Sequence, residues 1–363
     1  MGPRLAHARR RESPAALGRR RQTDVVRAAE ARLSTGRVEP VRRRRSAPPG
    51  VRDGLAASRQ PLARQGTYSI VACDRPSGEL GVAVQSHWFS VGSVVGWARP
   101  GVGAVATQAI AQVAHGPNAL LHMAEGLDPL GAVEAVLRED ESADHRQLGV
   151  VDAAGRVAAH TGKSCIAHAG AQTGEGFSCQ ANMMAREGVP GAMADAYTSH
   201  DGDLAERLLA ALDAAESAGG DVRGQQSAAL LVVPASGEAW RTRFDLRVDD
   251  DEAPLSELRR LLRLARAYEL ADRAEELLAG QDAPAGAELY RQISELAPDS
   301  DELTFWAGIG VGAQDLAVGA ELIRSAASRN PSWLELLERL PSELAPAAAS
   351  LRAAIAEGTE RAS

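Results

Sequence analysis

Polar side chains lie at the ends of apolar, strand-like segments of this sequence. Thr67 follows Gly66 and opens the first of these segments, and Ser86 and His87 close the second. Because a side chain at the end of a strand can project into a cleft, Thr67 and Ser86 are candidate site residues. Ser86 and His87 do not form a hydrolytic dyad, since neighbours on a strand point to opposite faces of the sheet.

Amide side chains supply further candidates. Thr107 and Gln108 end the stretch GVGAVATQ (101–108), whose backbone N–H groups and Gln108 amide could stabilise an oxyanion. The glycines of this stretch are equally suited to a tight turn. Asn182, in CQANMM, follows a strand and could donate a hydrogen bond into a cleft.

The loop GGDVRGQQSAAL places Asp221, Arg223, Gln226 and Ser227 just before an apolar strand. Arg223 could bind a substrate carboxylate through two parallel hydrogen bonds. Asp221 and Arg223 could instead form an ion pair that fixes the loop. The sequence leaves both interpretations open.

No cofactor and no metal are expected. His115 and His122 are seven residues apart and His160 and His168 are eight apart, and neither pair has a companion carboxylate at a useful position. The three cysteines form no CxxC pair, which fits free thiols in a reducing cytosol. The GxGxxA match at 101–106 continues as a strand instead of opening a helix, so it does not predict a dinucleotide site.

Charge divides the 363-residue chain at residue 66. Residues 1–66 hold 17 Arg, no Lys and 5 acidic residues, a net charge of +12, whereas the rest carries −20 and all 13 aromatic residues. Residues 1–66 therefore cannot build a core, and we expect a disordered Arg-rich leader. The leader lacks the apolar stretch of a secretory signal, and no run reaches the ~20 apolar residues of a membrane span. We expect a cytoplasmic protein with no membrane partner, and the acidic body argues against nucleic acid as a partner of the folded part.

Hydrophobic patterning between residues 67 and 248 groups strands apart from helix pairs. The expected strands are 67–74, 79–86, 93–97, 103–108, 147–152, 157–161, 177–181, 227–233 and 240–248. The expected helices are 117–125, 129–139, 191–197 and 204–218. Because strands and helices do not alternate one by one, the pattern favours an α+β layered sandwich over a doubly wound sheet.

Beyond Pro254 the sequence is helical and repeats itself. QDAPAGAELYR (281–291) and QDLAVGAELIR (314–324) are related by an offset of 33 residues. The same offset relates Gly286 to Gly319, Tyr290 to Ile323 and Pro298 to Pro331. This period resembles a tetratricopeptide unit, in which the glycines would mark close helix crossings and the prolines would end each second helix.

The repeat predicts a tetratricopeptide-like helical domain over residues 255–345 and a C-terminal tail over 346–363. Two copies of the repeat are few for a free-standing repeat domain, because each unit must bury its apolar face against a neighbouring unit. The helices expected at 255–270 and 333–340 would serve as caps. This domain either binds a peptide or protein or packs on the first domain.

Several motifs occur in a fixed order along the chain: TYSIVACD, ELGVAVQS, GVGAVATQ, HRQLGVVD, TGKSC and DVRGQQSAALLVV. Together they resemble the bacterial family catalogued as domain of unknown function 1028, which has an N-terminal-nucleophile (Ntn) hydrolase-like fold. The resemblance covers about residues 67–235. It implies a four-layer αββα sandwich over 67–248, and it implies no substrate.

The Ntn mechanism requires Thr, Ser or Cys as the first residue of the mature chain. The free α-amine, with an ordinary pKa near ~8, then accepts the side-chain proton. The resemblance makes Thr67 the candidate nucleophile, and the Gly66–Thr67 junction resembles the self-cleavage site of threonine-type enzymes. A β-branched residue is also ordinary in a strand. The leader blocks the amine while it is attached, so activity requires its removal or a later translation start.

The sequence departs from the Ntn pattern in two ways. Threonine-type enzymes place a lysine about one hairpin after the nucleophile, but residues 94–99 contain none, and the only lysine of the chain is Lys163 in TGKSC. The family pattern near Asn182 is closer to QGN, so Ala181 leaves the backbone less free. Without a nearby lysine, the Thr67 amine would act as the base alone or with water.

Two functions from different classes follow. The first is hydrolysis of a small amide or peptide-like bond through Thr67, at C–N bonds other than those of standard proteins. The second is a non-catalytic ligand-binding or assembly module that keeps the Ntn-like fold, with a helical-repeat tail for protein interaction. By analogy with Ntn-like sheets, we expect a homo-oligomer.

Overall fold

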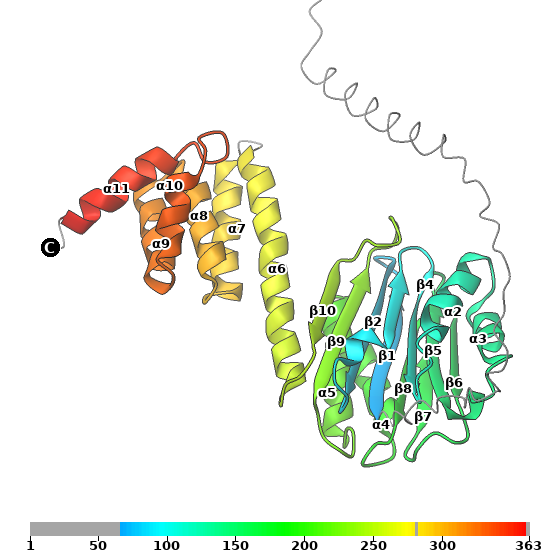
Figure 1. Cartoon of the computed structure of the whole chain (residues 1–363). Helices are drawn as coiled ribbons and strands as arrows, with labels where there is room; N and C mark the ends of the chain where they lie inside the picture. The colour runs from blue at the N-terminus through cyan, green and yellow to red at the C-terminus, as the bar shows by residue number, and fades with distance from the viewer. Residues whose placement is uncertain (1–65, 280–281, 361–363) are drawn as a thin grey trace, which may run out of the picture. The chain divides into compact units, whose positions relative to one another are not determined.

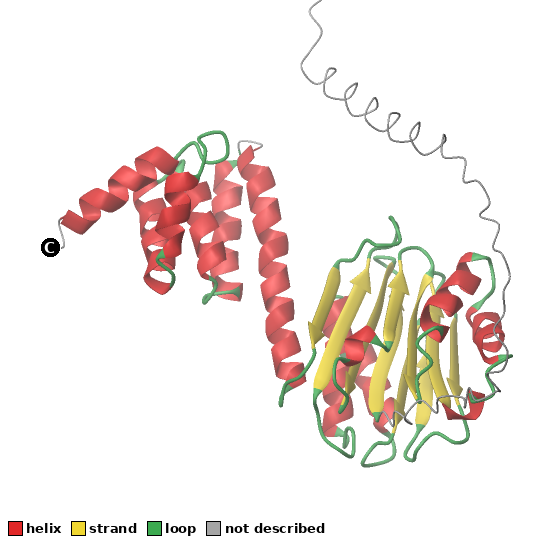
Figure 2. Cartoon of the chain, viewed as in Figure 1, coloured by secondary structure: helices red, strands yellow, loops and turns green. Residues whose placement is uncertain are grey.

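The computed structural model describes residues 66–279 and 282–360. They form an α+β domain with two antiparallel sheets, followed by an all-helical region (Figure 1 and Figure 2). All of the expected leader except Gly66 lies outside the described residues. None of the helices in the described ranges is long and apolar enough to cross a membrane.

Sheet A has six strands in the order β10-β9-β2-β1-β8-β7. Their bounds are β1 Thr67–Asp74, β2 Glu79–Ser86, β7 Gly170–Gly174, β8 Phe177–Asn182, β9 Ser227–Val233 and β10 Phe244–Val248. Thr67 lies opposite Ser86 of β2 on one side and opposite Asn182 of β8 on the other. Strand pairing therefore brings three candidate site residues together at one end of the sheet.

Sheet B has four strands in the order β3-β4-β5-β6. Their bounds are β3 Gly96–Arg99, β4 Gly103–Ala109, β5 Arg146–Asp152 and β6 Val157–Thr161. The two sheets share an apolar core that includes Val71 and Val82 of sheet A and Ala104 and Val151 of sheet B. Val71 and Cys73 of β1 both point into this core, because side chains two residues apart on a strand share a face.

Two helix pairs cover the outer faces of the sheets. Helices α2 (His115–Ala124) and α3 (Pro129–Leu137) pack on sheet B, and α4 (Val189–Ser199) and α5 (Leu204–Ser217) pack on sheet A. Asp128 begins α3 by accepting a hydrogen bond from the backbone of Gly131, and Asp203 begins α5 in the same way. These aspartates satisfy N–H groups that a helix leaves unpaired at its start.

Helix α6 (Pro254–Ala279) contributes to two hydrophobic cores. Leu255, Leu258 and Leu262 are buried in the core beneath sheet A. Further along, Ala267 and Ala274 are buried in the core of the helical region. Helix α6 begins at residue 254, where the sequence predicts the domain boundary, but its first turns belong to the core beneath sheet A. A truncation at that residue therefore removes part of the sandwich core.

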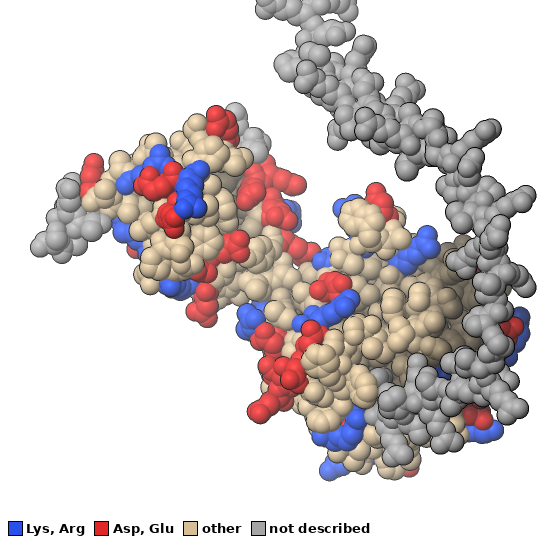
Figure 3. Space-filling view, in the orientation of Figure 1, with Lys and Arg blue, Asp and Glu red and all other residues tan. Residues whose placement is uncertain are grey.

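Ion pairs also connect α6 with the two-sheet domain. Arg243, the residue just before β10, lies 3.2 Å from Glu79 of β2 and 3.0 Å from Glu269 of α6. Arg266 of α6 lies 2.7 Å from Asp203 at the start of α5. These pairs are partly exposed, so each contributes little to stability by itself. On the face of the described part shown in Figure 3, acidic and basic side chains are interspersed.

The helical region continues with α7 (Ala283–Leu296), α8 (Asp301–Gly312), α9 (Leu316–Arg329), α10 (Ser332–Arg339) and α11 (Ala348–Glu360). The close helix crossing predicted at Gly319 is confirmed, because a Cβ there would lie 2.4 Å from the Cα of Gly312. Pro298 and Pro331 follow the ends of α7 and α9, as predicted. The expected tail over 346–363 was wrong for most of its length, since α11 forms there and Leu351 is fully buried.

Two further elements differ from the sequence-based expectation. Strand β7 was missed because GAQTG is polar and largely exposed at the edge of sheet A. The strand expected over 93–97 is displaced, since residues 91–93 form a 3-10 turn and β3 begins at Gly96. Both segments are short, and their structure depends on pairing with distant strands.

We predict that Leu258→Ala destabilises the two-sheet domain although residue 258 lies beyond its last strand. Leu258 is fully buried beneath sheet A. Removing such a side chain lowers the free energy of unfolding by about 2–5 kcal/mol. Urea denaturation followed by tryptophan fluorescence measures the change. The control is Leu344→Ala, at a leucine that is 74% exposed, and equal effects of the two variants would contradict the shared role of α6.

Candidate functional site

The candidate site lies between the two sheets at the end where β1 begins. The Thr67 hydroxyl donates a hydrogen bond to Oγ of Ser86 at 3.1 Å. Thr67 and Ser86 are both fully buried. The site therefore belongs to the interior of the sandwich, where hydrogen bonds are stronger than in water.

Two donors converge on the carbonyl oxygen of Gly66, the acyl group that precedes Thr67. Ser86 Oγ donates to this oxygen, and Arg223 Nη2 donates to it from 3.1 Å. A hydroxyl and a guanidinium fixed on one carbonyl oxygen are the donors that would stabilise negative charge developing there. The Thr67 hydroxyl is therefore hydrogen-bonded to one of the two donors that hold its own preceding carbonyl.

Asp221 fixes the position of Arg223. Its carboxylate accepts hydrogen bonds from Nε and Nη2 of Arg223 at 3.0 and 2.7 Å, and from the backbone of Arg223 and His87. A Cβ on Gly66 would lie 2.5 Å from Oδ2 of Asp221, so the close approach requires glycine. Asp221 therefore binds the Nε–Nη2 edge of the guanidinium, and the ion pair that the sequence offered as one of two interpretations is present. Binding of a substrate carboxylate by Arg223 stays a prediction.

Buried amides hold the backbone carbonyl of Thr67. Gln108 Nε2 donates to this carbonyl at 3.3 Å, and Asn182 Nδ2 lies 3.5 Å from it. Both amides also donate to Oε1 of Gln147, at 2.8 and 3.0 Å. Gln147 in turn donates to the carbonyl of Ala181 at 2.9 Å. The amide groups therefore satisfy one another in the interior and orient the first residue of β1.

Backbone conformations of high energy flank two of these amides. Ala109 directly follows Gln108 with φ of 69°, and Met183 directly follows Asn182 with φ of 59°. A non-glycine residue rarely adopts positive φ, and such residues cluster at functional sites. The left-handed turns end β4 and β8 immediately after the amide side chains.

A buried ion-pair cluster holds the loop that follows Ala109. Arg146 Nε and His115 Nε2 each lie 2.7 Å from Asp140, and Arg146 Nη1 donates to the carbonyl of Ile110 at 2.5 Å. Burial opposes the charge of Asp140, but the hydrogen bonds from Arg146 and His115 dominate and hold its pKa well below the usual range. The carboxylate therefore stays ionised and keeps this loop in place.

Most of the predicted site residues meet at this end of the sandwich. The group consists of Thr67, Ser86, Gln108, Asn182, Asp221 and Arg223. Thr107 does not join it, because its hydroxyl points to the other face of β4 and donates to the carbonyl of Gln112 at 3.2 Å. Lys163 forms an exposed ion pair with Asp144 at 2.9 Å.

The backbone N–H groups of Gly101 and Gly103, which were expected as oxyanion donors, lie away from the Thr67 site. Gly103 pairs with Asp152 at the opposite end of β4 from Gln108. Gly101 has φ of +68°, which confirms the tight-turn interpretation. Gln147 was missed by the sequence analysis, since a polar residue in QLGVVD gives no indication that its side chain contacts four other strands.

Thr67 is acylated by Gly66 and its side chain has no exposure to solvent. The hydrolase hypothesis requires a free amine and access for a substrate, and neither condition is met in the chain as described. Over residues 66–279 and 282–360, no group of three or more His, Cys, Asp and Glu side chains could hold a metal ion. The chemistry available at the site comes from hydroxyls, amides and the Asp221–Arg223 pair.

Comparison with known proteins identifies the family. Residues 67–258, more than half of the chain, match the family described as "Family of unknown function (DUF1028)". The chain belongs to DUF1028. The predicted membership of DUF1028 is confirmed, and the match extends beyond residue 235 into the first turn of α6.

A solved structure in DUF1028 is similar to this chain. The crystal structure of protein SPO2555 from Silicibacter pomeroyi is 33% identical, with a TM-score of 0.51. The similarity covers 55% of this chain and 89% of that one. No curated protein matches the sequence. Since DUF1028 carries no assigned function, the function has to be argued from the geometry of the site.

We predict that Gln147→Leu destabilises the domain more than an equivalent change at the surface. The variant leaves the amides of Gln108 and Asn182 without their shared acceptor. Each buried donor left unpaired costs about 1–3 kcal/mol of folding free energy. Urea denaturation measures the loss, and the control is Gln172→Leu on the exposed edge strand β7. Equal stability of the two variants would show that the amide cluster does not hold the site together.

Proposed function

We propose that this DUF1028 chain is an Ntn-type hydrolase of a small amide or peptide-like bond, with Thr67 as nucleophile. The observation that supports the proposal is the convergence of Ser86 and Arg223 on the Gly66 carbonyl, beside the Thr67 hydroxyl. In this proposal the two sheets and their helix pairs are the four-layer αββα frame of an Ntn hydrolase, with Thr67 opening a central strand.

The first step of the proposed function is cleavage of the Gly66–Thr67 bond. Oγ1 of Thr67 attacks the carbonyl carbon of Gly66, and Ser86 and Arg223 stabilise the oxyanion. The C–N bond then breaks, an ester forms between Gly66 and the Thr67 side chain, and the hydroxyl proton passes to the Thr67 nitrogen. Water hydrolyses the ester to a Gly66 carboxylate and a free Thr67 hydroxyl. The product begins with Thr67 and carries the free amine that the mechanism requires.

The second step uses the same donors on a substrate. The substrate carbonyl takes the position of the Gly66 carbonyl, and the Thr67 amine accepts the proton of the hydroxyl as it attacks. Gln108 and Asn182 hold the backbone of Thr67 so that the hydroxyl keeps its direction. Because the only lysine is paired with Asp144 on the surface, the α-amine serves as the base.

The complete burial of Thr67 favours a second candidate function, a binding or assembly module without chemistry. In that case the polar cluster would be a structural device that specifies how the two sheets pack. The helical region, with its tetratricopeptide-like repeat, would bind a peptide or protein under either proposal. The two functions differ in whether the Gly66–Thr67 bond is ever broken.

We predict that the purified full-length protein cleaves itself between Gly66 and Thr67 on incubation. Intact-mass spectrometry should detect a fragment that begins with Thr67. Thr67→Ala should remain uncut, and Thr67→Ser should still be cut because it keeps a hydroxyl. Ser86→Ala should slow the cleavage by about 10²–10³-fold, the usual effect of removing one oxyanion donor.

The control for this cleavage is Ser90→Ala, at a partly exposed serine on the loop after β2. It should be cut at the rate of the unmodified chain. Cleavage that persists in Thr67→Ala would assign the cut to another protease and contradict the self-cleavage step.

We also predict hydrolysis of amides by a chain produced with Thr67 as its first residue. Only the neutral α-amine can accept the proton, so kcat/KM should rise with pH through the amine pKa near ~8. Turnover of a panel of chromogenic small amides measures the rate, and Thr67→Ala should be inactive. Turnover that is unchanged in Thr67→Ala, or that is absent from a correctly folded chain beginning at Thr67, would favour the binding module.

A further inference from the structure

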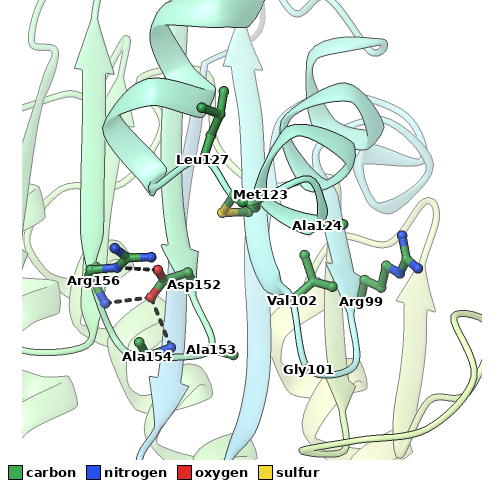
Figure 4. Close-up of a pocket in the computed structure, with 11 residues that line it drawn as sticks. Arg99, Gly101, Val102, Met123, Ala124, Leu127, Asp152, Ala153, Ala154 and Arg156 are labelled. Carbon is green, nitrogen blue, oxygen red and sulfur yellow. Dashed lines mark hydrogen bonds and ion pairs between the residues drawn. The ribbon is translucent and has the colours of Figure 1, made fainter.

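A surface cavity of about 380 Å³ lies at the end of the sandwich opposite Thr67 (Figure 4). Three segments line it: the β3–β4 turn (99–102), the end of α2 with the residues after it (123–127), and the β5–β6 turn (152–156). Strand β1 begins at Thr67, and near its other end Cys73 contacts the carbonyl of Ala153 in the cavity wall. The cavity is therefore separate from the Thr67 site.

Three apolar side chains, Val102, Met123 and Leu127, lie among the mostly polar lining of the cavity, and Met123 lies between the two arginines in the view of Figure 4. Met123 is only 8% exposed, whereas Leu127 is 43% exposed, so Leu127 presents more apolar surface than Met123. An apolar surface of this kind gains stability when an aliphatic group displaces water from it.

Two arginines lie on opposite sides of this apolar surface (Figure 4). Asp152 is fully engaged, because it accepts hydrogen bonds from the backbone of Ala154 and Arg156 and from Nε of Arg156. Arg156 uses only Nε in this contact, so its two terminal nitrogens are available. Arg99 makes no ion pair or side-chain hydrogen bond with any residue of the described ranges.

The charges of the lining leave a net excess of one positive charge, since Asp152 balances only one of the two arginines. A guanidinium presents parallel N–H donors that match the two oxygens of a carboxylate. The apolar surface between the arginines suits an alkyl chain. The volume lies near the lower end of the ~300–1,000 Å³ range of small-molecule sites, so the chain must be short.

We propose that this cavity binds a short-chain aliphatic carboxylate. The carboxylate contacts Arg99 or the free nitrogens of Arg156, and the alkyl chain lies on Val102, Met123 and Leu127. This site is independent of the proposed hydrolase activity, because none of its lining residues belongs to the Thr67 cluster. Its ligand is an aliphatic anion and not an amide.

Isothermal titration calorimetry of the full chain with hexanoate tests the proposal. We expect saturable one-to-one binding that weakens with acetate, because the apolar contact is lost. Dodecanoate should bind no better than hexanoate, because its chain exceeds the cavity. Replacing the arginine that contacts the carboxylate, in one of the two variants Arg99→Gln and Arg156→Gln, should weaken hexanoate binding by about tenfold or more.

Matched controls separate this site from general charge effects. Arg138→Gln removes the same charge from an exposed arginine at the end of α3 and should leave hexanoate binding unchanged. Hexanol and hexylamine should bind at least about tenfold more weakly than hexanoate, since they cannot accept the arginine hydrogen bonds. Circular dichroism verifies that each variant is folded.

Three outcomes would overturn the proposal. The first is the absence of saturable hexanoate binding. The second is binding that survives unchanged when Arg99 and Arg156 are both replaced by glutamine in a folded protein. The third is equal affinity for hexanoate and hexylamine, which would show that the arginines do not select the ligand.

Discussion

The carbonyl oxygen of Gly66 is the group around which this end of the sandwich is organised. Ser86 donates to it from β2, and Arg223 donates to it from the loop before β9. Asp221 holds Arg223 through two hydrogen bonds along one edge of its guanidinium and lies so close to Gly66 that no side chain fits there. Two donors held on one carbonyl oxygen would stabilise negative charge on that oxygen. The proposal that the Thr67 hydroxyl attacks this carbonyl depends on that arrangement.

The rest of the fold allows so many polar groups to be buried together. Apolar side chains fill the space between the sheets along most of its length, and the amides of Gln108, Gln147 and Asn182 replace them at one end. Buried amides are costly unless each finds a partner. Here the pairing of Thr67 with Asn182 and of Gln108 with Gln147 brings those partners together across four strands. Stability and site geometry therefore depend on the same contacts.

The sequence predicted local structure well and long-range placement less well. The β1–β2 hairpin has its predicted bounds because alternation and turn chemistry are local properties. Strand period also explains why Thr107 and Gln108 could not both join one site, since neighbours face opposite sides. The role of Gln147 could not be predicted, because it arises from contacts with β4, β6, β7 and β8. The shared helix α6 was placed in the second domain because its helical pattern gives no indication of which core each turn enters.

A crystal structure of a chain that begins at Thr67, determined with a small carboxylic acid bound, tests the central claim most directly. The account predicts that one carboxylate oxygen occupies the place of the Gly66 carbonyl oxygen. There it should accept hydrogen bonds from Ser86 Oγ and Arg223 Nη2, with the Thr67 hydroxyl and amine facing the bound acid. A structure in which residue 67 stays sealed from solvent, or in which Arg223 turns away from this position, would contradict the account.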